Sequence, residues 1–210
     1  MPFDPDTLGG TNGGDFQIAA FELLQSIDGF NKLTRVFGEL VISQCLNLRS
    51  VQGFSALTEA GDITFGGLPE LDNFPELPAL TTINGARAQE PGLKIDGTNV
   101  LDIPGLNNLA NFIGAIRISN NQQLNDISGF NGLVDGGGQL PPSSLQLGIF
   151  IESNSLNTIT GFTQLTTASS LRLLNNPNLE RADGVRAAAT RRRGTLRLAR
   201  TTFLTPGRPV

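Results

Sequence analysis

The stretch Ile116–Leu133, I-R-I-S-N-N-Q-Q-L-N-D-I-S-G-F-N-G-L, contains the pattern that decides the fold of this chain. It opens with an apolar–polar–apolar triplet, passes through an Asn pair, and then places apolar residues at Leu124, Ile127 and Phe130. A triplet of period two is typical of a short strand that shows two side chains to a core. The Asn and Gly residues that follow indicate a chain that turns a corner, and they argue against a helix.

The same pattern recurs along most of the chain. A marker pair, usually Gly-Phe, follows each triplet, and the second residues of successive pairs lie 24, 20, 32, 24, 32 and 23 positions apart. Polar or Gly/Pro-rich insertions account for the two long spacings. Eight triplets share this frame: Phe16-Gln17-Ile18, Leu40-Val41-Ile42, Ile63-Thr64-Phe65, Leu93-Lys94-Ile95, Ile116-Arg117-Ile118, Ile149-Phe150-Ile151, Leu171-Arg172-Leu173 and Leu196-Arg197-Leu198.

A unit of about 24 residues cannot bury its apolar side chains alone, so successive units must stack and pair their strands in parallel. The sequence therefore predicts an all-β fold, a parallel β-solenoid of about seven or eight turns with few or no helices. We expect one solenoid domain over residues 15–203, with irregular C-terminal repeats from about residue 185. Residues 1–14 are predicted to be a flexible leader, and residues 204–210 a C-terminal tail.

Apolar residues between the strands are predicted to complete the core. They form pairs at Leu24/Ile27, Leu46/Val51, Leu68/Leu71, Val100/Ile103, Leu124/Ile127 and Leu156/Ile159. A closing Leu ends six of the units, at Leu33, Leu57, Leu77, Leu109, Leu133 and Leu165.

Composition narrows the classes of function. The chain has no His, so both the commonest general base and the commonest zinc ligand are missing, which argues against most hydrolases and metalloenzymes. The net charge of −4 is uneven: residues 1–180 hold 18 acids and 7 bases (−11), and residues 181–210 hold 1 acid and 8 arginines (+7). No apolar run is long enough for a transmembrane segment, and no signal-peptide pattern is visible. We expect no cofactor and no metal site.

Three residues are predicted to form a structural ladder inside the stack. Cys45, Asn121 and Asn176 each lie eight positions before a marker Gly. A buried Asn at a turn can bond open backbone groups and stack on its neighbours, and Cys can replace it as a small buried group. A reactive or metal-binding thiol at Cys45 is the less favoured interpretation, because no basic neighbour or second ligand stands nearby in the sequence.

The middle residue of each triplet points away from the core. Five neighbouring strands thereby present Lys94, Arg117, Phe150, Arg172 and Arg197 as a candidate ligand-binding face, a row of cations with one exposed aromatic residue. Such a row suits an extended anionic partner, either an acidic polysaccharide or an acidic protein face. The competing interpretation is that these outward positions are simply solvated.

Two further groups of charged residues are candidate sites. The arginine-rich end, with Arg191-Arg192-Arg193, lacks an aromatic platform or a nucleic-acid motif, so nucleic acid is an unlikely partner. Asp102 and Asp126 occupy the same position in adjacent units, and paired carboxylates can serve acid–base or Ca²⁺ chemistry. No third acidic or polar group accompanies them, so we interpret them as solvated turn carboxylates.

The units Gly114–Leu133 and Ser170–Val185 resemble the repeat of receptor L-domains, with an apolar triplet, an N-N-P-x-L-like turn and an Ile-x-Gly-Phe-x-x-Leu-like element. Similar repeats occur in insulin- and growth-factor-receptor ectodomains and in fungal cell-wall proteins. The resemblance covers roughly residues 15–185. It implies a right-handed solenoid related to leucine-rich repeats, an extracellular or cell-surface setting, and a non-catalytic binding or structural role with a protein or anionic polysaccharide partner. Solenoids also host polysaccharide lyases and hydrolases, so a carbohydrate-active enzyme is the alternative.

Overall fold

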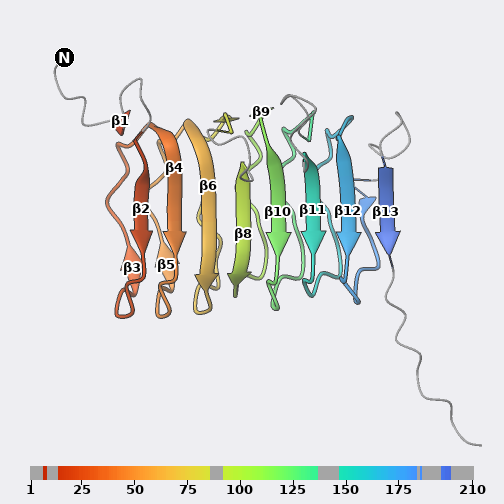
Figure 1. Ribbon diagram of the computed structural model, residues 1–210, viewed down its shortest axis with the longest axis horizontal. Coiled ribbons are helices and arrows are strands. Elements are labelled where there is room, and N and C mark those ends of the chain that lie inside the picture. Colours follow the sequence, from red (N-terminus) through yellow and green to blue (C-terminus); the bar gives the residue numbers. More distant parts are fainter. Residues whose placement is uncertain are drawn as a thin grey trace, which may run out of the picture.

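The regular secondary structure of the computed structural model consists almost entirely of strands (Figure 1). The structure describes residues 7–8, 14–85, 92–136, 147–183, 185 and 195–199, with the backbone alone for 7–8 and 195–199. Every strand pair in this part of the chain is parallel, so the predicted all-β, parallel fold is confirmed. No helix among these residues is long and apolar enough to cross a membrane.

Two sheets make up the described structure. The large sheet has eleven strands, β1 (Thr7–Leu8), β2 (Phe16–Ala19), β4 (Arg35–Ser43), β6 (Glu59–Leu68), β7 (Thr82–Ile83), β8 (Leu93–Thr98), β9 (Asn111–Phe112), β10 (Ala115–Ser119), β11 (Gly148–Glu152), β12 (Ser170–Leu174) and β13 (Thr195–Ala199). The small sheet pairs β3 (Ser26–Ile27) with β5 (Ser50–Val51). Strand β1 lies within the predicted leader and pairs with Arg35 and Val36 of β4. Residues 204–210, the predicted tail, lie outside the described residues.

The eight predicted triplets all lie in the large sheet, one in each of β2, β4, β6, β8, β10, β11, β12 and β13. Consecutive triplets pair position for position: Ile116, for example, is paired with Leu93 on one side and with Ile149 on the other. Figure 1 shows these strands side by side in chain order. Each row of equivalent side chains therefore runs straight across the sheet.

The inward residues of the triplets form the centre of the core. In β4 to β11 the first and third residue of every triplet are fully buried, and Leu171 and Leu173 of β12 are nearly so. The six closing leucines are also buried. One predicted core residue is wrong: Leu46 is 50% exposed, and Leu48 is buried in its place. Leu48 stands five positions before its marker Gly, as Val100 and Leu156 do, so the correct position is counted from the marker.

A left-handed residue stands two positions after the triplet in seven of the strands. These residues have φ between 52° and 63°, and they are Ala20, Gln44, Gly67, Gly97, Asn120, Ser153 and Asn175. Gly adopts this conformation freely and Asn tolerates it, whereas other L-residues are strained by roughly 1–2 kcal/mol. The turn is thus imposed by the stacking even where the side chain disfavours it.

We predict that Ser153→Gly raises the free energy of unfolding by about 0.5–1 kcal/mol, because relief of the left-handed strain exceeds the added chain entropy. Gly97→Ala should lower it by about 1 kcal/mol, since an added Cβ there meets no atom closer than 3.7 Å and only the φ of 63° opposes it. Urea unfolding measures both changes.

Ser170→Gly is the matched control, because Ser170 lies in extended strand β12. There the same substitution should lower the free energy of unfolding, since Gly loses more chain entropy on folding. A Ser153→Gly protein no more stable than the parent chain would contradict the account of the turn.

Candidate functional site

The predicted ligand-binding face lies on five adjacent strands, β8, β10, β11, β12 and β13. Lys94 is paired with Arg117, Arg117 with Phe150, and Phe150 with Arg172, and Arg197 continues the row through the backbone of β13. The side chain of Arg197 lies outside the described structure. The register therefore brings the other four side chains into one row, which we call the sheet face.

Phe150 was predicted to be exposed, and this prediction is wrong: the residue is only 3% exposed. The Arg117 guanidinium carbon lies 4.8 Å from the centroid of its ring, and that of Arg172 lies 5.4 Å away. Both guanidinium groups are attracted to the negative face of the aromatic ring, and together they cover it. The ring therefore positions two cations instead of offering a surface to a ligand.

The two arginines carry most of the available positive charge on the sheet face. Lys94 has a carboxylate nearby, with its Nζ 3.9 Å from Asp96 Oδ2, and Asp96 also accepts hydrogen bonds from Ser119 and Asn120. No carboxylate among the described residues lies within ion-pair distance of Arg117 or Arg172. A ligand anion would thus meet two uncompensated guanidinium groups, which are suited to bidentate bonds with carboxylate or phosphate oxygens.

The predicted ladder residues lie in one column just after the strands. Asn121 Nδ2 donates to the Ile95 carbonyl at 3.2 Å, and Asn176 Nδ2 donates to the Ile151 carbonyl at 2.9 Å. The two residues do not touch each other, because Asn154 lies between them. Asn154 Nδ2 donates to the Ile118 carbonyl at 3.0 Å. Three Asn side chains therefore occupy successive levels, where a level is one triplet strand with the turn that follows it.

These Asn side chains also bind the backbone of the neighbouring level. Asn154 Oδ1 accepts from the Asn121 N–H at 3.0 Å, and Asn176 Oδ1 accepts from the Asn154 N–H at 3.1 Å. Asn121 Oδ1 accepts from both the N–H and the hydroxyl of Thr98, at 3.0 and 2.8 Å. Thr98 therefore begins the run, which we call the Asn ladder. Such buried polar groups remain stable because each is hydrogen-bonded.

Cys45 occupies the equivalent position two levels before Thr98. It is fully buried, and its Sγ contacts the Ser43 carbonyl at 3.3 Å. Leu68 occupies the level between Cys45 and Thr98 and is paired with Thr98 across the sheet. The column is thus apolar or weakly polar at Cys45 and Leu68, and strongly polar from Thr98 onward.

Counting back from the marker Gly missed Asn154 and Thr98. The segment between strand and Gly is one residue shorter in these two units than in the units of Asn121 and Asn176. Counting three positions forward from the end of each triplet finds Cys45, Asn121 and Asn176, and adds Thr98 and Asn154. The turn is rigidly related to the strand, and the later segment absorbs the difference in length.

Asp102 and Asp126 are neighbours across a parallel bridge and remain partly exposed, but their carboxylates also make hydrogen bonds that the sequence did not predict. The two oxygens of Asp102 accept from the N–H and the hydroxyl of Ser128, at 3.0 and 2.5 Å. Those of Asp126 accept in the same way from Thr160, at 3.0 and 2.6 Å. Each carboxylate thus ties its own level to the next one, which is a structural role.

The described residues contain no group of three or more His, Cys, Asp or Glu side chains placed to hold a metal ion. Comparison of the chain with models of known protein families, with curated proteins and with solved structures finds no match in any of the three.

We predict that Asn154→Ala lowers the free energy of unfolding by about 3 kcal/mol. The substitution leaves the buried Ile118 carbonyl and the Asn121 N–H without their side-chain partner, and each unsatisfied group costs about 1–3 kcal/mol. Chemical unfolding followed by circular dichroism measures the change.

Asn178→Ala is the matched control, since Asn178 is exposed and should change stability by less than about 0.5 kcal/mol. Equal losses in the two variants would show that the Asn ladder does not hold the levels together.

Proposed function

We propose that the chain is an L-domain-like, right-handed parallel β-solenoid of about seven or eight turns with repeats of about 24 residues. The pairing of consecutive triplets position for position supports this proposal. The left-handed exit turn recurring from one strand to the next supports it as well. The solenoid acts as a non-catalytic extracellular or cell-surface binding or structural module.

The sheet face binds an anionic polysaccharide or the acidic face of a protein. The observation that carries this proposal is the arrangement of Arg117 and Arg172 on either side of Phe150. Side-chain entropy normally opposes the use of arginines, and the shared ring reduces that loss by holding both guanidinium groups in place before a ligand arrives. Their spacing follows the sheet, where adjacent strands lie about 4.8 Å apart, so an extended ligand crossing the strands can meet them in turn.

A carbohydrate-active enzyme is less well supported than a binding module. The adjacent carboxylates that would suit acid–base chemistry, Asp102 and Asp126, are each held by a Ser or Thr of the next level. A general acid or base must reach the proton that it transfers, whereas every oxygen of these two carboxylates already accepts a hydrogen bond from the next level.

We predict that replacing Arg117 and Arg172 together by Ser weakens retention on immobilised polygalacturonate at least about tenfold. Each charge-assisted hydrogen bond contributes about 1.5–3 kcal/mol, and 1.4 kcal/mol corresponds to a factor of ten. Retention of the parent chain should also fall as salt is raised. Affinity chromatography across a salt gradient measures both effects.

The matched control is the Arg35→Ser, Arg181→Ser double variant, which removes the same charge from two exposed arginines that are paired with Glu59 and Asp183. Thermal unfolding of both double variants confirms that each is folded. Salt-insensitive retention, or equal losses in both double variants, would overturn the proposed binding face. Sustained cleavage of the polysaccharide that is abolished by Asp126→Asn would favour the enzyme.

A further inference from the structure

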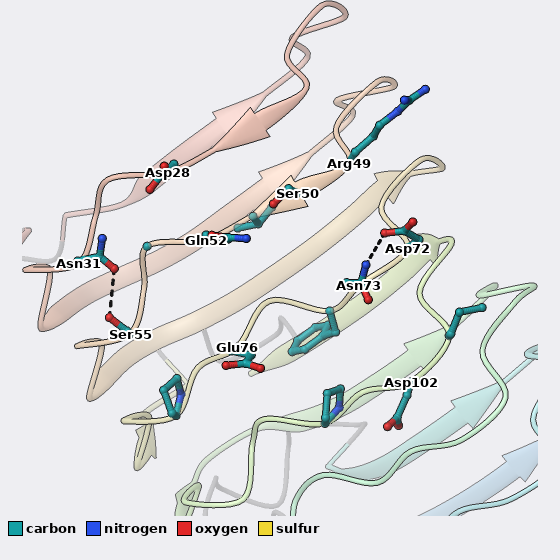
Figure 2. Close-up of a pocket in the computed structure, with 16 residues that line it drawn as sticks. Asp28, Asn31, Arg49, Ser50, Gln52, Ser55, Asp72, Asn73, Glu76 and Asp102 are labelled. Atoms are coloured by element: carbon teal, nitrogen blue, oxygen red, sulfur yellow. Dashed lines mark hydrogen bonds between the residues drawn. The ribbon is translucent and has the colours of Figure 1, made fainter.

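A groove of about 700 Å³ opens beside the small sheet, away from the residues of the sheet face. Figure 2 shows Ser50 and Gln52 on one side of the groove and Asp102 on the opposite side. Asn73 and Glu76 lie on the segment that runs between the two sides. The groove is a second candidate site, and it is independent of Arg117 and Arg172.

The groove exists because one unit is shorter than its neighbours. From Cys45 to Phe54 the chain advances nine positions, but from the equivalent Leu68 to Phe74 it advances only six. The missing residues are those that form β5 in the preceding unit. The small sheet therefore stops at β5, where a third strand would otherwise follow.

Strand β5 consequently has one side without a neighbouring strand. In the described part of the chain it pairs only with β3. The N–H groups of Ser50 and Gln52 donate toward β3, to the carbonyls of Gln25 and Ile27. Backbone groups alternate in direction along a strand, so the N–H and C=O of the intervening Val51 point toward the groove. An edge of this kind is a template for another strand.

The groove is lined mainly by acidic side chains, which favour a basic partner. Asp28, Asp72, Glu76 and Asp102 contribute carboxylates to its lining, and Arg49 is the one base among the lining residues. Arg49 is already 3.5 Å from Glu70. Asp28 and Glu76 make no side-chain hydrogen bond or ion pair with the described residues, so both are available to a cation.

We propose that this groove binds an extended segment of a partner protein that carries Lys or Arg, which adds as one strand to the free side of β5. The gap corresponds to one omitted strand, and its backbone edge supplies hydrogen bonds to any extended chain. The carboxylates select a basic sequence, because side chains of an added strand alternate in direction and every second one faces the lining. The groove and the sheet face thus attract partners of opposite charge.

The probe is a fluorescein-labelled hexapeptide of alternating Lys and Val, and binding to the full chain is measured by fluorescence anisotropy. We expect saturable binding that weakens as salt is raised. A Glu/Val hexapeptide should not bind. The same Lys/Val peptide with alternate amides N-methylated should bind at least about fivefold more weakly, since it loses backbone donors but keeps its charge.

Two variants test the groove itself. The Asp28→Asn, Glu76→Gln double variant should weaken binding of the Lys/Val peptide at least about fivefold, whereas Glu22→Gln with Glu180→Gln, which removes two exposed carboxylates that do not line the groove, should not. Val51→Pro removes the N–H that faces the groove and leaves the bonds of Ser50 and Gln52 to β3 in place, so it should weaken binding in a similar way.

The proposal is overturned if the Lys/Val peptide does not bind, or if its N-methylated form binds equally well, because charge alone would then explain the attraction. Equal losses in the two carboxylate double variants would overturn it also. Should Val51→Pro fail to fold, the N-methylated peptide still decides the role of the backbone. The Arg117→Ser, Arg172→Ser variant should bind the peptide normally, so failure at the sheet face and failure at the groove are distinguishable.

Discussion

Parallel pairing of consecutive strands, position for position, is the constraint on which the rest of this molecule depends. Side chains alternate between the two faces of a strand, so a slip of one residue would move the buried side chains of that strand to solvent. The pairing survives where the chain is longest between strands: β6 pairs with β8, and β10 with β11, in the same frame as the other strands. Differences in unit length are therefore confined to the connections.

The Asn ladder, the hydrogen bonds of Asp102 and Asp126, and the sheet face all follow from this register. A side chain placed after one strand lies beside its equivalent on the next, so a single Asn can satisfy two backbone groups of the level before it. Asp102 and Asp126 act similarly through Ser128 and Thr160. On the outward side, the same alignment brings two guanidinium groups, from β10 and β12, onto the aromatic ring of β11 between them.

The strands were predictable because their alternation is strong, and all eight triplets lie where the sequence places them. Turn residues are located by counting from the strand, which finds Asn154 and Thr98 where counting from the marker Gly misses them. The later core residue instead keeps its distance from the marker, five positions before it at Val100 and Leu156, and the same count would have placed Leu48 in the core instead of Leu46. The burial of Phe150 could not be read from alternation, because it depends on how two flexible arginines fold over the ring.

The groove beside β5 could not be predicted from the sequence pattern. The short spacing between Phe54 and Phe74 was visible, but a short connection alone does not reveal which structural element has been lost. The pairing of β3 with β5 and the position of Asp102 beyond the gap identify that element as a strand of the small sheet. An irregular unit in an otherwise regular array thus creates a concave feature that the regular units lack.

The residues three positions after each triplet change at Thr98 from apolar to hydrogen-bonding, and this change limits which units can be duplicated. A level carrying Asn completes the hydrogen bonds of the level before it, and the run begins where the Thr98 hydroxyl and N–H turn toward Asn121. Duplication of a level within the Asn ladder would preserve this chain of donors and acceptors. Insertion there of a copy of the Leu68 level would interrupt it with an apolar side chain. The levels therefore fall into two classes, those before Thr98 and those of the Asn ladder. Gene duplication can lengthen the chain within either class, whereas a copy inserted into the other class is disfavoured.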